Sequence, residues 1–314
     1  MILSSLSLTA FALLSSVQQA YAWGADGHHA VGYVAMEFLS PQVRSIVETA
    51  LGSKYNRSLG PAASWADEIK SGKGYAWASS LHYIDAHDDP PRQCSVNPEH
   101  DCENGRCILT AIANYTSRLV DTDLDSSQRQ EALKFLDHFI GDIGQPLHAE
   151  GLEKGGNGIK VKCNDGHKKL HGVWDTNILV ELLDVKHGGS VSRFTDSLVQ
   201  QIQTGAFHSS ASSWLDCGSK SMEDDITDFL DSNGDQPLTC PLHWAIESNA
   251  HVCSTVLNFD KNENVCKGRY YEEAASIIEI QIAKQGYRLA GWLNVLFSGK
   301  VGLPESQAVF QVQN

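Results

Sequence analysis

The segment LDHFIGDIGQPLH, residues 136–148, decides how the rest of this chain is interpreted. It closes a strongly helical run, and Pro146 then ends the helix because proline cannot continue the helical hydrogen bonds. Within the run, His138 and Asp142 are four residues apart, so their side chains lie on one helix face, one turn apart. His148 follows the break. The segment therefore predicts a helix that carries possible metal ligands on one face.

The same helical period recurs along the chain. Apolar residues in 31–39 are spaced three and four apart, and Ser40-Pro41 is typical of a cap and first turn of the next helix. Further helices are expected over 107–120, 128–143, 170–183, 192–203, 241–257 and 271–297. Alternating strand patterns are scarce, and the best candidate is a hairpin-like stretch at 155–161. The sequence predicts an all-α domain with at most one small β-hairpin.

The start of the chain is typical of a signal peptide. Residues 1–22 carry no charge, and their apolar stretch 6–14 is too short to cross a bilayer. The leader ends in the small-x-small sequence AYA, which signal peptidase prefers. We therefore expect a secreted protein whose mature chain begins at Trp23. A free amine beside a carbonyl can chelate a metal, so cleavage next to Trp23 and His28 could itself build a metal site.

The composition fits one secreted domain. An apolar fraction of 42% is enough for a substantial core, and no linker or repeat divides the chain. We expect one domain over 23–297 and a tail over 298–314 that has no clear period. The net charge of −14 argues against a broad basic surface for nucleic acid, because that binding mode needs Lys and Arg to neutralise phosphates. Any phosphate contact must be local, and divalent cations could supply it.

Eight cysteines without a Cys-x-x-Cys pair indicate disulfides in an oxidising compartment. Two glycosylation sequons, at Asn56 and Asn114, fit the same compartment. An acidic stretch rich in Ser, Gly and Pro at 216–240 is interpreted as an irregular excursion bracketed by Cys217 and Cys240.

A second His–Asp pair repeats the four-residue spacing at His171 and Asp175. His167 also lies four residues before His171, so the spacing leaves the partner of His171 open. Either pair alone is better explained as an ordinary His–Asp hydrogen bond, but two such pairs can meet when helices pack. Mixed His and Asp ligands suit zinc in a hydrolytic site that keeps an open coordination position.

Six short motifs then occur in a characteristic order. They are WGADGH at 23–28, WAD at 65–67, HYIDA at 82–86, HFIGDIGQPLH at 138–148, GGNG at 155–158 and HGVWDTN at 171–177. In combination they resemble the secreted zinc-dependent, single-strand-specific nucleases of fungi and plants, from Trp23 to about Phe297. The resemblance implies a helical fold, also similar to zinc phospholipase C, around three zinc ions.

The resemblance also implies the role of each site residue. The first ion would be held by Asp67, His82, His138 and Asp142, the second by His148, His171 and Asp175, and the third by the Trp23 amine and carbonyl, His28 and a shared Asp142. Asp67 would also orient or deprotonate the attacking water, and Lys70 would contact the phosphate. The pocket for a base would consist of Tyr83, Asp85, Gly155 and Asn157.

The cysteines extend the family pattern. The resemblance implies the disulfides Cys94–Cys253 and Cys102–Cys107. It leaves open the pairing of four additional residues, Cys163, Cys217, Cys240 and Cys266.

The activity that the resemblance implies is hydrolysis of single-stranded DNA and RNA to 5′-phosphate products. The same site is expected to act on 3′-nucleotides, with no membrane insertion and no protein partner. Two alternatives stay open. One is a zinc phospholipase C-like phosphodiesterase, although the pocket around Tyr83 and Asp85 favours a base over a lipid. The other is a secreted zinc-binding protein without turnover, which the presence of Asp67 argues against.

Overall fold

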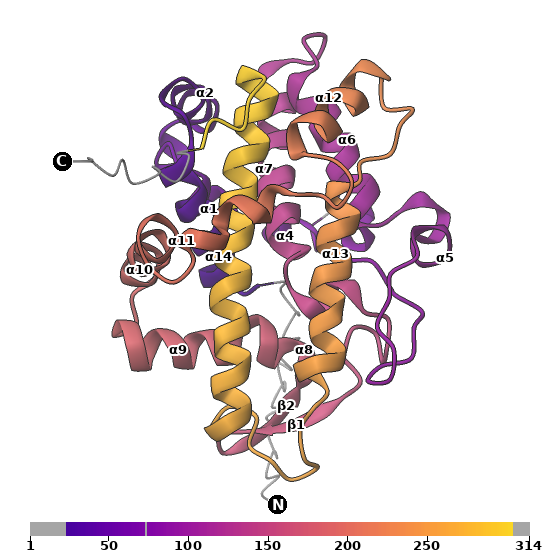
Figure 1. Cartoon of the computed structure of the whole chain (residues 1–314), viewed down its shortest axis with the longest axis vertical. Coiled ribbons are helices and arrows are strands. Elements are labelled where there is room, and N and C mark those ends of the chain that lie inside the picture. Colours follow the sequence, from indigo (N-terminus) through magenta and orange to yellow (C-terminus); the bar gives the residue numbers. More distant parts are fainter. Residues whose placement is uncertain (1–22, 73, 304–314) are drawn as a thin grey trace, which may run out of the picture.

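The computed structural model describes residues 23–72 and 74–303. The expected signal peptide and most of the expected tail therefore lie outside the described residues. Three helices frame the molecule: α1 (Ala25–Phe38), α7 (Ser126–Asp142) and the long α14 (Gly268–Ser298). α14 runs along most of the molecule in Figure 1 and packs against both α1 and α7.

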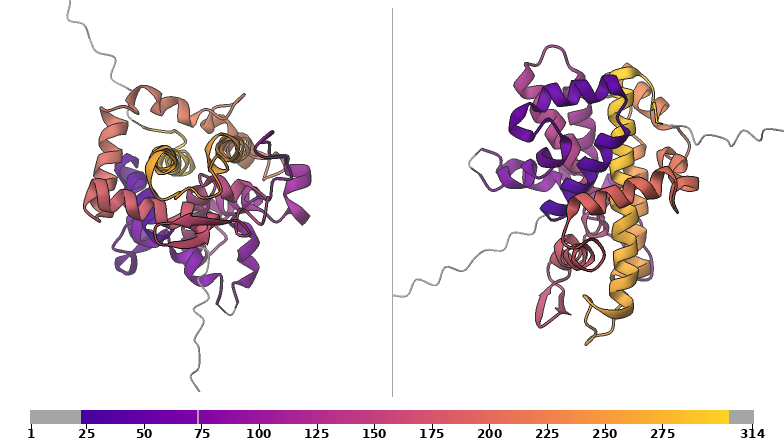
Figure 2. Two further views of the ribbon diagram at one scale, coloured as in Figure 1. Left: turned by 90° about the horizontal axis from the view of Figure 1, so that it is seen from below. Right: turned by 90° about the vertical axis from the view of Figure 1, so that its left-hand side faces the viewer.

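The other helices surround this frame. They are α2 (Pro41–Leu51), α3 (Leu59–Ala62), α4 (Trp65–Ile69), α5 (Pro98–Asp101), α6 (Ile108–Val120), α8 (Leu170–Gly172), α9 (Ile178–His187), α10 (Val191–Gln203), α11 (His208–Ala211), α12 (Met222–Asp231) and α13 (Cys240–His251). Short 3-10 turns are η1 (Ser53–Tyr55), η2 (Ala76–Leu81), η3 (Glu103–Gly105), η4 (Pro146–Ala149) and η6 (Ser212–Leu215), and π-helical turns are η5 (Val173–Asn177) and η7 (Val252–Val256). Figure 2 shows α13 and α14 end-on, side by side. Every helix expected from the periodicity is present, which confirms the all-α prediction.

Local sequence explains where α2 and α7 begin and how closely α1 and α14 pack. The Ser40 hydroxyl accepts a hydrogen bond from the backbone N–H of Val43 (3.4 Å), which confirms it as the cap of α2. Asp125 and Gln128 exchange the two hydrogen bonds of a capping box at the start of α7. Where α1 crosses α14, a Cβ added to Gly286 would lie 2.5 Å from the Val34 Cβ, so only glycine permits this approach.

The small hairpin lies further along the chain than expected. Its strands are β1 (Lys160–Cys163) and β2 (Gly166–Lys169), which pair antiparallel with Cys163 opposite Gly166. The glycine-rich part of the expected stretch precedes the hairpin instead of turning it. The turn is made at Asn164, which has a φ of 52°, a conformation that asparagine tolerates better than most residues.

The segment 216–240 is not irregular throughout, so that expectation was wrong. Its centre is α12, in which Met222, Ile226 and Phe229 are buried at helical spacing. Three acidic residues, Glu223, Asp224 and Asp225, occupy the first turn, where they complement the positive end of the helix dipole.

Four disulfides tie the surface loops to the helices. They are Cys94–Cys253, Cys102–Cys107, Cys163–Cys266 and Cys217–Cys240. The first two are the pairs implied by the resemblance, and the other two join the additional cysteines. Cys163–Cys266 fastens the hairpin to the chain just before α14, where Lys162 also bridges to Asn264.

Candidate metal centre and substrate pocket

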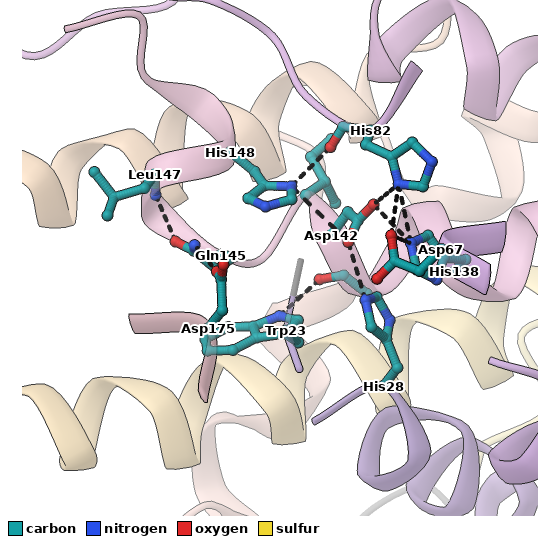
Figure 3. A network of polar contacts seen from close by, with 12 residues as sticks. Trp23, His28, Asp67, His82, His138, Asp142, Gln145, Leu147, His148 and Asp175 are labelled. Carbon is teal, nitrogen blue, oxygen red and sulfur yellow. Dashed lines mark hydrogen bonds and ion pairs between the residues drawn. The ribbon is translucent and has the colours of Figure 1, made fainter. Parts of the chain in front are cut away.

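The first group of site residues converges on Asp142 at the end of α7 (Figure 3). One carboxylate oxygen, Oδ2, lies 2.9 Å from His82 Nδ1 and 3.1 Å from His138 Nε2. The other oxygen, Oδ1, lies 3.1 Å from His28 Nε2 on α1. Asp67, on α4, places its Oδ1 atom 3.4 Å from His138 Nε2. The fold thus brings five predicted metal ligands, from α1, α4, α7 and the end of η2, into one buried cluster.

A second group lies beside the first. His171 Nε2 is 3.3 Å from Asp175 Oδ2, and the ring of His171 stacks on that of His148 with centroids 5.1 Å apart. One ligand atom of each of these three residues lies within 4.8 Å of the others. His167 lies on the exposed strand β2. The structure therefore places Asp175, and not His167, beside His171.

The start of the described chain is anchored between the two groups. Trp23 is fully buried and its indole Nε1 donates to the Gly141 carbonyl at 2.9 Å, on the last turn of α7. The next backbone N–H, of Gly24, donates to the Asp175 carbonyl at 2.7 Å. Residue 23 is thus held next to the candidate ligands, as Figure 3 shows for its side chain.

Three of the histidines are oriented in the same way. Each donates its Nδ1 proton to a backbone carbonyl: His138 to Ala63 (2.6 Å), His148 to His82 (2.8 Å) and His171 to Gly155 (2.6 Å). Because a carbonyl can only accept, Nδ1 must carry the proton. The Nε2 atom of each neutral ring is therefore free to bind a metal ion.

Several buried side-chain atoms of the candidate ligands have no hydrogen-bond partner. They are both ring nitrogens of His28, Nε2 of His82 and His148, Oδ1 of Asp142 and Oδ2 of Asp175. The His28–Asp142 pair is close enough for an ion pair but does not have hydrogen-bond geometry. An unsatisfied buried polar atom typically costs about 1–3 kcal/mol, so this many in one place is unfavourable unless cations complete the site. The residues present therefore fit metal ions.

The pKa values follow from burial and from the two carboxylates. Burial lowers the pKa of His28 and His82 to about 4, so both are neutral ligands near neutral pH. His138 behaves differently: burial opposes protonation, but Asp142 and Asp67 together raise its pKa to about 10. The negative charges of Asp67 and Asp142 thus stabilise a positive charge beside His138. A metal ion can supply that charge in place of the proton.

Lys70 lies beside the candidate catalytic carboxylate. Its Nζ atom is 2.6 Å from Asp67 Oδ1. Although burial opposes ionisation, His138 and Lys70 hold the pKa of Asp67 below its usual range. Lys70 also lines the cavity described next, so its side chain links Asp67 to that cavity.

A cavity of about 450 Å³ is lined by three of the candidate metal ligands, and we call it the substrate pocket. His82, His148 and His171 form one part of its lining, and all four predicted base-binding residues form another: Tyr83, Asp85, Gly155 and Asn157. The lining also includes four residues that were not predicted from the sequence: Ser79, His87, Glu150 and Lys154. Tyr83 keeps 38% of its surface exposed, so an aromatic ring is available to a ligand.

The wall that carries Gly155 is an unusual left-handed turn. Glu153, Lys154, Gly155 and Gly156 all have positive φ, between 50° and 75°. Two of these residues have side chains, for which this conformation is unfavourable by roughly 1–2 kcal/mol each. The turn directs the Gly155 carbonyl at His171, so one backbone segment both forms the pocket wall and orients a candidate metal ligand.

Sequence reasoning missed Gln145 as a site residue. Its side-chain Nε2 donates to Asp175 Oδ1 at 2.5 Å, while its Oε1 accepts from the Leu147 N–H at 2.6 Å. It is fully buried and orients Asp175 without facing the pocket. The sequence feature that could have indicated Gln145 is its position, as an uncharged polar residue, between the predicted ligands Asp142 and His148.

Two further observations concern glycosylation and membrane insertion. Both sequon asparagines, Asn56 and Asn114, are exposed. Of the helices in the described residues, none is long and apolar enough to cross a membrane.

Comparison with known proteins gives a consistent result. The S1/P1 nuclease family model matches residues 23–298. Nuclease P1 of Penicillium citrinum is 38% identical over 282 residues, which is 89% of this chain and 99% of that protein. Nuclease S1 of Aspergillus oryzae is 37% identical over 91% of this chain and 96% of its own, and Endonuclease 3 of Arabidopsis thaliana is 31% identical over 92% and 93%. The chain therefore belongs to the S1/P1 nuclease family and is an enzyme that hydrolyses phosphodiester bonds.

Proposed function

We propose that this chain is a secreted, zinc-dependent endonuclease that cleaves single-stranded DNA and RNA to 5′-phosphate products and also removes 3′-phosphates from nucleotides. The observation that carries the proposal is the shared lining of the substrate pocket. Three histidines of the metal groups and an exposed tyrosine face the same cavity. A phosphate and its neighbouring base can therefore be bound together.

The ligand set of the proposal is the one that the resemblance implies. Three zinc ions would be held by Trp23, His28, Asp67, His82, His138, Asp142, His148, His171 and Asp175. Zinc lowers the pKa of bound water and stabilises charge on phosphate oxygens and on the departing 3′ oxygen. In this proposal the mature chain begins at Trp23, spans a domain to residue 297, and provides its terminal amine as a ligand.

The protein's own side chains position the reactants. Asp67 Oδ1 accepts a hydrogen bond or proton from the attacking water, and the neighbouring Lys70 keeps Asp67 ionised and contacts the phosphate. Tyr83 stacks on the base next to the scissile phosphate. Asp85, Asn157 and the Gly155 backbone contact the edge of that base. Stacking tolerates any base but needs it unstacked from its neighbours, which favours single strands.

The oxidising compartment is supported by the four disulfides, and the exposed Asn56 and Asn114 side chains are accessible to a glycan.

The test is a substrate comparison with the secreted protein. Purified from the culture medium, it is expected to cleave a labelled single-stranded oligonucleotide much faster than its duplex, to leave 5′-phosphate ends, and to release phosphate from 3′-nucleotides. Phosphatidylcholine serves as the competing substrate. Hydrolysis of the lipid without cleavage of the oligonucleotide would support the phospholipase alternative, and no turnover of either would support a binding protein.

A further inference from the structure

A second, smaller cavity adjoins the substrate pocket. This side cavity has a volume of about 200 Å³ and shares Tyr83 and Asp85 with the pocket. The rest of its lining is Ser80, Asp101, Glu103, Asn104, Arg106 and Cys107. None of the candidate metal ligands lines it. Because Tyr83 and Asp85 border both spaces, these two residues form the partition between them.

The walls of the side cavity are fixed to the partition. The Cys102–Cys107 disulfide closes a short loop that carries three of the lining residues. The N–H of Ile108, directly after the loop, donates to the Tyr83 carbonyl at 3.0 Å. Arg106 Nη2 donates to the Trp77 carbonyl at 2.6 Å, which ties the loop to η2 on the opposite side. The cavity is therefore preformed.

Its charge suits a base better than a phosphate. Three carboxylates, Asp85, Asp101 and Glu103, face a single cation, Arg106. The Asp101 oxygens already accept the backbone N–H groups of His87 and Asn97, at 3.1 and 2.7 Å. A second phosphate would be repelled, whereas the acceptors and donors of Glu103, Asn104 and Arg106 can pair with the polar edge of a base.

We propose that the side cavity binds the base of the nucleotide directly 5′ to the one in the substrate pocket, stacked on the second face of Tyr83. The inference rests on the proposed function. The metal ligands line only the substrate pocket, so the scissile 3′-phosphate lies on that side and the chain leads to the side cavity in the 5′ direction. Tyr83 then separates two successive bases. That separation requires a single strand, because adjacent bases in a duplex stay stacked.

Phosphate release from two substrates tests the proposal. One is a nucleoside 3′-monophosphate, which fills only the substrate pocket. The other is the dinucleotide with the same 3′ end, whose internal methylphosphonate linkage resists cleavage. One stacked base should lower KM for the dinucleotide by about fivefold or more. Ser80→Phe, which fills the side cavity, should abolish this advantage, and Arg106→Ala, which removes one polar partner of the base, should reduce it. Both variants should leave KM for the mononucleotide unchanged.

Arg269→Ala is the matched control, because this exposed arginine at the start of α14 lines neither cavity. It should keep the full difference between the substrates. Equal KM values for the two substrates in the unmodified enzyme would overturn the inference, as would variants that impair both substrates equally. Failure of the unmodified enzyme to release phosphate from either substrate would instead count against the proposed function.

Discussion

Asp142 shows how a single residue organises the proposed centre. Its two oxygens face opposite sides, with His82 and His138 at one and His28 at the other. The four-residue spacing in the sequence predicted the contact with His138, because both residues lie on one helix face. No spacing rule could predict the approach of His28 or His82, since those contacts depend on how α1 and η2 pack against α7. The family motifs supplied that information.

Asp67 has the most specific proposed role among these residues. We expect Asp67→Asn to leave the fold and much of the zinc in place but to reduce kcat by orders of magnitude, because water orientation and one ligand are both altered. Oligonucleotide cleavage and zinc content measure the two effects. Glu68→Gln, an isosteric change at the exposed neighbour on the same helix, should keep normal rates. Near-normal cleavage by Asp67→Asn would exclude the role assigned to this carboxylate.

At the scale of elements, the helices were predictable because apolar periodicity and caps are local. The hairpin was misplaced because glycine density at 155–158 was interpreted as a strand region. Those glycines serve instead a left-handed turn that supports His171. α12 was missed because its acidic composition obscured the buried positions Met222, Ile226 and Phe229. The disulfide of the same segment, Cys217–Cys240, could not be assigned from spacing at all.

The left-handed turn gives a prediction of its own. In Gly155→Ala, the added Cβ would lie 2.7 Å from the Leu147 carbonyl oxygen and 3.3 Å from His171 Nδ1, at a φ of 60°. We expect a lower melting temperature and selective weakening of zinc binding at His148, His171 and Asp175, because His171 loses its orienting carbonyl. Gly166→Ala, in the hairpin where a Cβ meets nothing within 4 Å, is the control and should retain full zinc. Identical zinc retention in both variants would show that the turn does not support His171.

For the whole molecule, burial of the histidines couples stability to pH. In the folded chain the pKa values of His28 and His82 are about 4, whereas in the unfolded chain they are about 6.5. At these two residues the unfolded state therefore binds more protons between these values, so their contribution to the stability of chelator-treated protein is lost as the pH falls from 6.5 to 4. The buried carboxyls of Asp137, Glu150 and Asp175, whose pKa values are raised by burial, act in the opposite direction. His138 has the opposite shift, and its contribution is lost only as the pH rises through about 10. Urea midpoints of the parent protein and of His82→Ala, both chelator-treated, check the direction across the acidic range. The variant should lose less stability on acidification, and an equal loss in both proteins would contradict the assignment.

Removal of the expected signal peptide gives a further prediction. If the Trp23 amine is a ligand, one extra residue before Trp23 converts it to an amide, which is a poor zinc ligand. A version made with Met before Trp23 should fold, bind about two zinc ions instead of three, and cleave the oligonucleotide far more slowly than the signal-processed protein. Equal zinc content and equal rates would mean that Trp23 is only a packing residue.

The net charge of −14 argues against binding of a polyanionic substrate by a broad basic surface. We therefore expect the substrate to bind at the proposed metal centre. The most direct measurement of this account is zinc content and single-strand cleavage in the same samples of signal-processed protein, before chelation, after chelation and after zinc is restored. We predict about three zinc ions per chain, loss of cleavage with loss of zinc, and recovery of both on restoration. Cleavage that persists in protein shown to contain no metal, or protein that binds no zinc at all, would contradict it.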